Sequence, residues 1–320
     1  MKYARLIGMG SYLPEHILTN DELSKRIDTS DEWIWQRAGI RSRHIIADGQ
    51  GTTNMAEIAA RQALDAAGIP LDSIDLIIGT TASPDYIFPS MACMLQRQLG
   101  IKSCPAFDLQ AACSGFIYAL SVANQFIRSG AAKNVLIACS EASSRLINWE
   151  DRATCVLFGD GAGAAVLTAS DEPGLMSTII NAAGEYSDLL YVPNPLPGQP
   201  HQQTQAHMQM RGKEVFKMAV NTLGAIAEQI LTQNNISKSD IDWLVPHQAN
   251  QRIIEATAKK LNLPMEQVIL TLSKQGNTSS ASIPLALNEA IRDGRIKPGQ
   301  LLLLEAFGSG FAWGAALLRY

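Results

Sequence analysis

No CxxC pair occurs in this 320-residue sequence, and its five cysteines form an odd number. An odd count of thiols suits a reducing compartment, so we expect no disulfide framework. The chain also lacks an excess of basic residues, because 30 acidic and 26 basic residues give a formal net charge of −4. Such a chain has no uniform positive field to attract nucleic acid or an anionic membrane, and any basic binding site must be local.

Long hydrophobic runs are absent as well. The apolar stretch near the N-terminus is too short for a signal peptide, and the most apolar segment, which begins at Leu301, is interrupted by Glu305 and three glycines. We therefore expect neither export nor a membrane span, and a cytoplasmic location. With 47% hydrophobic and 18% charged residues, the composition excludes a disordered chain and is that of a globular protein with a large core.

The sequence does contain an internal repeat. Short β-branched or leucine-rich runs alternate with alanine-rich stretches of helical period, which is typical of an α/β protein with buried strands. The pattern that begins at Ile69 recurs 167 positions later at Ile236, and segment 123–130 matches segment 287–294 at an offset of 164. Two matches in the same order predict a duplicated α/β unit. Its halves are residues 1–172 and 173–320, which share one core.

Cys113 is the first candidate for chemistry. It follows an expected strand at residues 105–109 and opens an expected helix that runs to about Ser129. Unpaired N–H groups and the dipole at a helix start stabilise a thiolate, so we expect a lowered pKa and a nucleophilic thiol. We expect the remaining cysteines to be buried and inert: Cys93, Cys104, Cys139 and Cys155.

Two further residues are expected to join this thiol. His247 follows an expected strand at residues 242–245, and its place at the carboxyl edge of the sheet is where ligands bind in α/β proteins. Asn277 opens another helix, and the offset of 164 pairs it with Cys113. The repeat thus predicts that all three side chains converge on one cleft. Such a set fits thiol-based acyl transfer, and it also suits a cysteine hydrolase.

Two glycine-rich segments and one loop complete the pattern. Segment 158–167 lacks the Lys-Ser/Thr of a P-loop, so we expect a tight connection between strands. In segment 306–314 the glycines allow a close approach of main-chain N–H groups, and we expect an oxyanion site formed by the N–H groups of Ser309 and Cys113. The proline-rich stretch 191–208 predicts a surface loop in which His201 and His207 are solvated.

Three motifs together resemble the β-ketoacyl-[acyl carrier protein] synthase III family: AACSGF around Cys113, VPHQAN around His247 and QGNTSSAS around Asn277. The resemblance extends from GMGSYLPEHILTN near the N-terminus to FGSGFAWGAAL near the C-terminus. It implies a thiolase-like fold of five α-β-α-β-α layers. It also implies that Cys113 is acylated by an acyl-coenzyme A primer, with acetyl-coenzyme A favoured. His247 and Asn277 would then promote decarboxylation of malonyl-acyl carrier protein and stabilise the enolate, without a metal or cofactor.

The resemblance also implies binding residues. For coenzyme A, the matching positions are Trp33, Arg37, Arg152, Gly212 and Asn250. For the acyl carrier protein, they are Gln248, Ala249, Asn250, Gln251, Arg252, Lys259 and Lys260. The family is homodimeric, and Phe88 would reach into the acyl pocket of the partner subunit. The last three carrier positions are basic and share one helical face, which suits an acidic partner.

Some features keep alternatives open. Lys213 and Ser309 differ from residues common at these positions in the family. Trp35, Tyr86 and Ile87 could alter the acyl pocket, so the preferred length of the acyl chain does not follow from the sequence. One alternative is a relative that condenses another acyl chain or uses a coenzyme A-bound acceptor. Another is a catalytically silent binding protein on the same fold, against which the presence of all three candidate catalytic residues argues.

Overall fold

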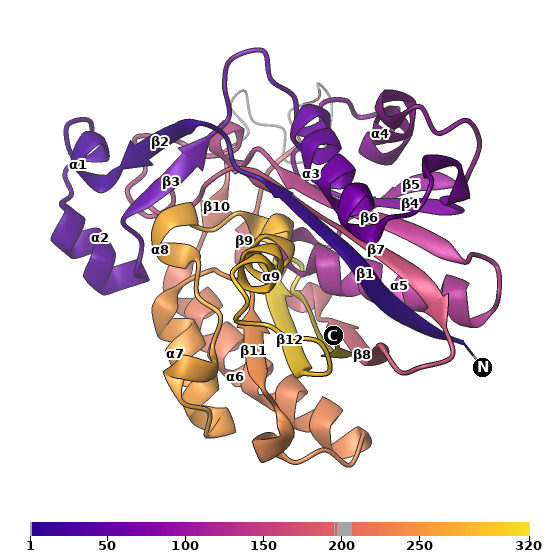
Figure 1. The fold of residues 1–320 in the computed structure, drawn as a ribbon. Helices are drawn as coiled ribbons and strands as arrows, with labels where there is room; N and C mark the ends of the chain where they lie inside the picture. Colours follow the sequence, from indigo (N-terminus) through magenta and orange to yellow (C-terminus); the bar gives the residue numbers. More distant parts are fainter. Residues whose placement is uncertain (1, 195, 197–206) are drawn as a thin grey trace.

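Figure 1 shows the fold of a computed structural model, which describes residues 2–194, 196 and 207–320. The first half of the chain contains the strands β1 (Tyr3–Tyr12), β2 (His16–Thr19), β3 (Ser42–Ile45), β4 (Leu76–Thr80), β5 (Ala106–Leu109), β6 (Asn134–Glu141) and β7 (Gly161–Ser170). Its helices are α1 (Asn20–Leu23), α2 (Asp31–Ala38), α3 (Thr52–Ala67), α4 (Met91–Leu99) and α5 (Gly115–Arg128).

The second half repeats the order of the main elements. Its strands are β8 (Leu175–Ala182), β9 (Leu190–Tyr191), β10 (Gln209–Met210), β11 (Trp243–Pro246), β12 (Leu301–Gly308) and β13 (Ala312–Arg319). Its helices are α6 (Gly212–Gln233), α7 (Gln251–Leu261), α8 (Leu272–Gln275) and α9 (Ser282–Arg292). None of the helices in the described part of the chain is long and apolar enough to cross a bilayer.

The main strands form one nine-stranded sheet in the order β11-β12-β13-β8-β1-β7-β6-β4-β5. The halves meet at β1 and β8, and from this contact outward the order of equivalent strands is the same on both sides. The parallel pairs also share their register: Leu76 lies opposite Val135 in one half, and Trp243 lies opposite Leu302 in the other, each partner 167 positions later. The duplicated α/β unit predicted from the sequence is therefore confirmed.

Alternate side chains of the central strands face different helical layers, because successive residues of a strand point to opposite faces. In β6, Ile137 faces the core that contains α5 and α9, whereas Leu136 packs against α3 and α4. In β12, Leu304 faces the same central core, and Leu303 packs against α6 and α7. Each of these fully buried side chains contributes roughly 1.5–3 kcal/mol. The result is the predicted thiolase-like architecture of five layers, with α5 and α9 in the middle (Figure 1).

The two central helices begin with matching turns. The 3₁₀ turns Ala112–Ser114 and Ser279–Ala281 precede α5 and α9, and the first residue of each has a positive φ, 44° and 51°. These turns lie 167 positions apart, so Cys113 corresponds to Ser280 and not to Asn277. The pairing inferred from the sequence is wrong, because the three residues missing from the second copy lie within the helix: α5 has 14 residues and α9 has 11.

The halves share their central core. The buried cluster between the two half-sheets combines Phe116 and Ile137 from the first half with Leu285 and Leu304 from the second. The chain passes from one half to the other in the turn between β7 and β8. We propose that residues 1–172 and 173–320 are structural halves of one folding unit, since neither half encloses this cluster alone.

Several local expectations are corrected by the structure. Cys139 and Cys155 are buried as expected and Cys104 is half-buried, but Cys93 is exposed, because it lies on the outward face of α4. His201 lies outside the described residues. His207 is half-buried, next to β10, which pairs with β9 at the base of the predicted loop.

Glu305 on β12 is a buried acid without a partner. Its side chain is 0% exposed, and neither carboxyl oxygen has a hydrogen-bond partner among the described residues. Burial raises the pKa of Glu305 to about 8, so this side chain is protonated at neutral pH.

We predict that Glu305→Gln stabilises the protein more at pH 8 than at pH 5, by about 3 kcal/mol in the free energy of unfolding. The ordinary pKa of this side chain is 4.5 and its folded value is about 8, so wild-type stability falls as the pH rises across this interval. Urea unfolding at both pH values measures the effect. The exposed control Glu266→Gln should show no such gain, and an equal effect of Glu305→Gln at both pH values would contradict the prediction.

Candidate active site

The three candidate catalytic residues meet at the seam between the halves. Cys113 lies in the turn before α5, His247 follows β11, and Asn277 lies between α8 and the turn before α9. All three line one cavity of about 560 Å³. The structure therefore brings together side chains that are 134 and 30 positions apart in the chain.

Close backbone packing fixes the position of Cys113. A Cβ on Gly308, the last residue of β12, would lie 2.8 Å from the amide nitrogen of Cys113, which is too close for any side chain. The hydroxyl of Ser114 also donates to the carbonyl oxygen of Ala312 at 2.8 Å. The turn that carries the thiol belongs to the first half, yet it is held by two strands of the second.

The pKa of the Cys113 thiol is raised, whereas the sequence predicted a lowered value. Cys113 is only partly exposed, and burial raises the pKa of its thiol to about 12, with a further rise from the nearby Glu141 carboxylate. Hydrogen bonds from the side chain of Ser279 and from the backbone N–H of Cys113 act in the opposite direction. Burial outweighs the effect of the helix start. The expectation of a lowered pKa is wrong for this structure, in which the thiol is protonated at neutral pH.

His247 is a neutral imidazole. Only 6% of the residue is exposed, and burial lowers its pKa to about 3. Nδ1 lies 2.6 Å from Oγ of Ser282, and the backbone N–H of His247 donates to the carbonyl oxygen of Glu305 at 2.8 Å. Within the described chain Nε2 has no hydrogen-bond partner, so one ring nitrogen is held by the protein and the other is available to a substrate.

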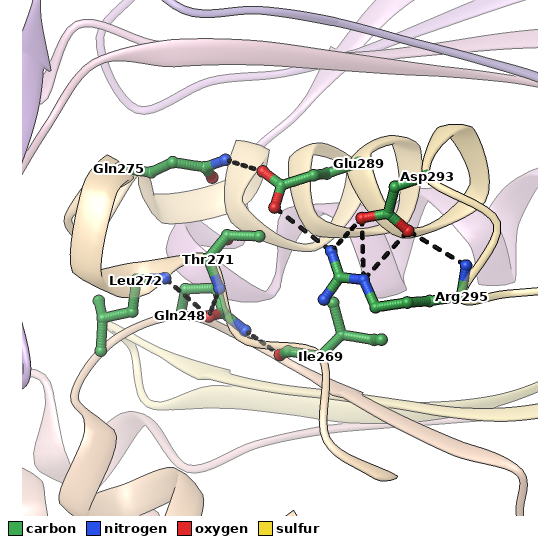
Figure 2. Close-up of polar contacts among 8 residues, drawn as sticks. All are labelled: Gln248, Ile269, Thr271, Leu272, Gln275, Glu289, Asp293 and Arg295. Atoms are coloured by element: carbon green, nitrogen blue, oxygen red, sulfur yellow. Dashed lines mark hydrogen bonds and ion pairs between the residues drawn. The ribbon is translucent and has the colours of Figure 1, made fainter. Parts of the chain in front are cut away.

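Gln248 fixes the turn that follows β11, and Figure 2 shows its hydrogen bonds to Ile269, Thr271 and Leu272. Its Nε2 donates to the carbonyl oxygens of Pro246 and Ile269, and its Oε1 accepts the N–H groups of Thr271 and Leu272. The side chain is 0% exposed. Because the protein uses every hydrogen-bonding group of this amide, the expectation that the Gln248 side chain contacts an acyl carrier protein is wrong. It is a structural anchor instead.

Asn277 is held through its backbone and its side-chain oxygen. Its N–H donates to the carbonyl oxygen of Leu157 at 2.9 Å, and its carbonyl oxygen accepts the N–H of Gly159 at 3.0 Å. Oδ1 accepts the N–H of Ser279 at 2.9 Å. Nδ2 has no partner in the part of the chain that the structure describes, so Asn277 presents a donor to the cavity. The glycine-rich segment 158–167 thus supports Asn277 and leads into β7, instead of connecting two strands as expected.

A second anchor, formed by Gln275, Glu289, Asp293 and Arg295, is drawn in Figure 2. Gln275, at the end of α8, donates to Oε2 of Glu289 on α9 at 3.1 Å. Oε1 of Glu289 accepts from Arg295, whose guanidinium also pairs with Asp293 at 2.7 Å. The bond from Gln275 to Glu289 joins the two helices that flank Asn277, and the pairing of Glu289 with Arg295 holds its carboxylate in place.

Glu141 is a site residue that the sequence analysis missed. It is buried at the carboxyl end of β6, where Oε1 accepts the hydroxyl groups of Ser279 and Ser280. Its Oε2 accepts the N–H of Ala82 and the hydroxyl of Ser83. Burial raises the pKa of Glu141, and these hydrogen bonds oppose the rise. A charged residue at the end of a largely apolar strand was the available sequence signal.

The residues expected to bind coenzyme A surround the same cavity. Its lining includes Trp33, Arg37, Arg152, Gly212 and Asn250. The guanidinium carbons of Arg37 and Arg152 lie 5.5 and 4.7 Å from the ring centroid of Trp33, so two cations flank one aromatic ring. The amide of Asn250 is already engaged, since it donates to the carbonyl oxygen of Arg37 and accepts the N–H of Arg252 at the start of α7.

The residues expected to bind the carrier protein differ in exposure. Arg252, Lys259 and Lys260 are exposed, whereas Ala249 and Gln251 are half-buried. Arg252 also lines the cavity and lies 5.4 Å from the ring centroid of Phe216 on α6. The stem of Lys260 packs along α6, because a Cβ on Gly224 would lie 2.2 Å from its Cδ. Arg252 therefore joins the basic face of α7 to the cavity.

A second cavity of about 420 Å³ also reaches Cys113. Its lining includes Gln110, Ser143 and Ser309, and the Ser309 hydroxyl donates to the carbonyl oxygen of Leu190. Phe88 lines neither cavity within this chain. It is 84% exposed, next to the exposed side chains of Ile87 and Tyr86.

Comparisons with known proteins agree with this geometry. The family described as 3-oxoacyl-[acyl-carrier-protein (ACP)] synthase III matches residues 107–184, and its C-terminal part matches residues 231–320. The chain is 60% identical over 319 residues to β-ketoacyl-[acyl-carrier-protein] synthase III of Methylococcus capsulatus, a match that covers 100% of this chain and 99% of the relative.

Solved structures give the same result. The crystal structure of 3-oxoacyl-[acyl-carrier-protein] synthase III from Aquifex aeolicus has a TM-score of 0.94 and 47% identity, covering 99% of this chain and 100% of that one. The enzyme of the same description from Pseudomonas aeruginosa has a TM-score of 0.93 and 39% identity, with coverages of 99% and 98%. The agreement of sequence, fold and site shows that the chain belongs to the β-ketoacyl-[acyl-carrier-protein] synthase III family.

Proposed function

We propose that the protein condenses an acyl-coenzyme A primer, with acetyl-coenzyme A favoured, with malonyl-acyl carrier protein. The products are 3-oxoacyl-acyl carrier protein, coenzyme A and carbon dioxide, and the reaction initiates fatty acid synthesis in the cytoplasm. The observation that supports this function most strongly is one cavity that holds a thiol, Cys113, beside the neutral imidazole of His247 and the amide of Asn277. In His247 the protein holds Nδ1, and in Asn277 it holds Oδ1. Nε2 of His247 and Nδ2 of Asn277 have no partner among the described residues.

The first step is acyl transfer. Sγ of Cys113 attacks the thioester carbonyl of the primer, the bond to the coenzyme A sulfur breaks, and the thiol proton leaves with coenzyme A. Because the pKa of the Cys113 thiol is raised to about 12, proton loss accompanies the attack instead of preceding it. The N–H groups of Cys113 and Ser309 stabilise the oxyanion, a role supported by the place of both residues in the lining of the second cavity.

The second step is decarboxylative condensation. The bond between the malonyl carboxylate and its α-carbon breaks, carbon dioxide leaves, and the electron pair forms an enolate. His247 and Asn277 donate hydrogen bonds to the enolate oxygen. The α-carbon then attacks the acyl group on Cys113, whose sulfur departs as a thiolate and takes up a proton from solvent. No electrons pass to an external acceptor, and decarboxylation drives the bond formation, so the proposed reaction uses no cofactor.

The positions of three groups of residues suggest where coenzyme A, the carrier protein and a second subunit bind. Trp33, Arg37 and Arg152 hold coenzyme A at the cavity mouth, which their shared lining and mutual stacking support. The exposed cations of α7, Arg252 and Lys259 with Lys260, receive the acidic carrier protein. A homodimer covers the apolar side chains around Phe88, since solvent-exposed apolar groups of this size mark an interface.

Incubation with radiolabelled acetyl-coenzyme A should place the label on the peptide that bears Cys113. Cys113→Ala should abolish labelling, whereas the control Cys93→Ser, which removes an exposed thiol, should retain it. Peptide mapping after denaturation measures the site of attachment. A label on another residue, or rapid release of free acetate without malonyl substrate, would point to a different mechanism or to a hydrolase.

Asn277→Ala should slow condensation by roughly 10²–10³-fold, the usual effect of removing one donor from an oxyanion site, while acyl-enzyme formation stays within about twofold. The reason is that the amide stabilises charge in the second step only. Measuring the two half-reactions separately tests this split, with Asn221→Ala on the exposed side of α6 as a control. An equal loss of rate in both half-reactions would show that Asn277 does not act specifically on the enolate.

A further inference from the structure

Ser282 lies directly behind the imidazole of His247. It is the first residue of α9, and it is 1% exposed. Its Oγ is 2.6 Å from Nδ1 of His247, and it accepts the backbone N–H of Gln248 at 3.3 Å. The serine therefore contacts the ring on the side away from the free Nε2.

The direction of the short hydrogen bond follows from a count of donors and acceptors. A serine hydroxyl has one proton to donate. The backbone N–H of Gln248 is itself a donor, so it cannot take this proton. Among the described residues, Nδ1 of His247 is the one acceptor that Ser282 Oγ contacts. Burial keeps bulk water away from the hydroxyl, and a buried donor left unsatisfied is costly. The hydroxyl consequently donates to Nδ1.

A neutral imidazole carries one ring proton, and a nitrogen that accepts a hydrogen bond does not hold it. The ring proton of His247 is thus on Nε2, the nitrogen without a partner in the described chain, on a residue that lines the cavity. The opposite tautomer would place a lone pair on Nε2, which repels an enolate oxygen instead of stabilising it.

We propose that Ser282 is a positioning residue that fixes His247 in the Nε2–H tautomer and so makes it a hydrogen-bond donor for the condensation step. This inference rests on the proposed function, because it assigns the orientation of a group in that same site. The hydroxyl is held in place by the start of α9 and by the turn that Gln248 anchors. Ser282 itself does not touch the substrate.

The direct test is nitrogen-15 NMR of the full-length protein with labelled histidine, in which protonated and unprotonated ring nitrogens resonate in separate ranges. His247→Gln assigns the signals. The wild type should show a protonated Nε2 and an unprotonated Nδ1. In Ser282→Ala the tautomers should mix, and in Ser282→Thr, which keeps the hydroxyl, the wild-type pattern should return. A wild-type ring protonated on Nδ1, or a spectrum unchanged in Ser282→Ala, would overturn the proposal.

Kinetics supply a second readout. In Ser282→Ala the ratio of the condensation rate to the acyl-transfer rate should fall by about 10- to 100-fold. The control Ser129→Ala, an exposed serine at the end of α5, should leave this ratio unchanged. An unchanged ratio in Ser282→Ala would also overturn the proposal. Failure of acetyl transfer to Cys113 in the wild type would instead refute the proposed function, so the two failures are distinguishable.

Discussion

The carboxylate of Glu141 joins the two halves of the molecule at the site. It receives hydrogen bonds from Ala82 and Ser83 in the first half and from Ser279 and Ser280 in the second. A buried carboxyl group is costly unless its oxygens are hydrogen-bonded, and these four donors satisfy both oxygens of Glu141. The carboxylate therefore requires both halves to be in place. It also fixes the turn whose N–H orients Asn277.

Burial gives the site its electrostatic character. The interior position lowers the pKa of His247 and raises that of the Cys113 thiol, so both groups are neutral in this structure. A neutral thiol and a neutral imidazole suit a reaction in which negative charge appears only transiently, first on a carbonyl oxygen and then on an enolate oxygen. Fixed N–H donors stabilise such charge with little reorganisation, which is the usual origin of large catalytic effects.

The sequence was sufficient to predict the architecture, because hydrophobic periodicity and an internal repeat can both be read directly from the order of residues. The alternation of strands and helices and the offset of 167 between the first matching segments predicted the duplicated unit, and the parallel strand pairs have the same offset. The pairing of Cys113 with Asn277 failed because a deletion inside α9 cannot be located from matches at its far end. Burial of Gln248 could not be foreseen either, since a motif does not tell which of its amides point inward.

Protonation and polar networks were the least predictable features. The thiol pKa depends on how much protein surrounds Cys113, and a helix start alone says nothing of this desolvation. Glu141 and Ser282 act through neighbours more than 30 positions away in the sequence, 138 for Glu141 with Ser279 and 35 for Ser282 with His247. Only the folded chain brings these partners together.

The central claim is that His247 and Asn277 act as neutral hydrogen-bond donors to the enolate. The most direct test is the pH dependence of carbon dioxide release from radiolabelled malonyl-acyl carrier protein, measured on enzyme already acylated at Cys113. Because burial holds the pKa of His247 at about 3, the rate should be flat between about pH 5.5 and pH 8. A titration with a midpoint near the ordinary histidine value of about 6.5, lost in His247→Asn, would contradict the account.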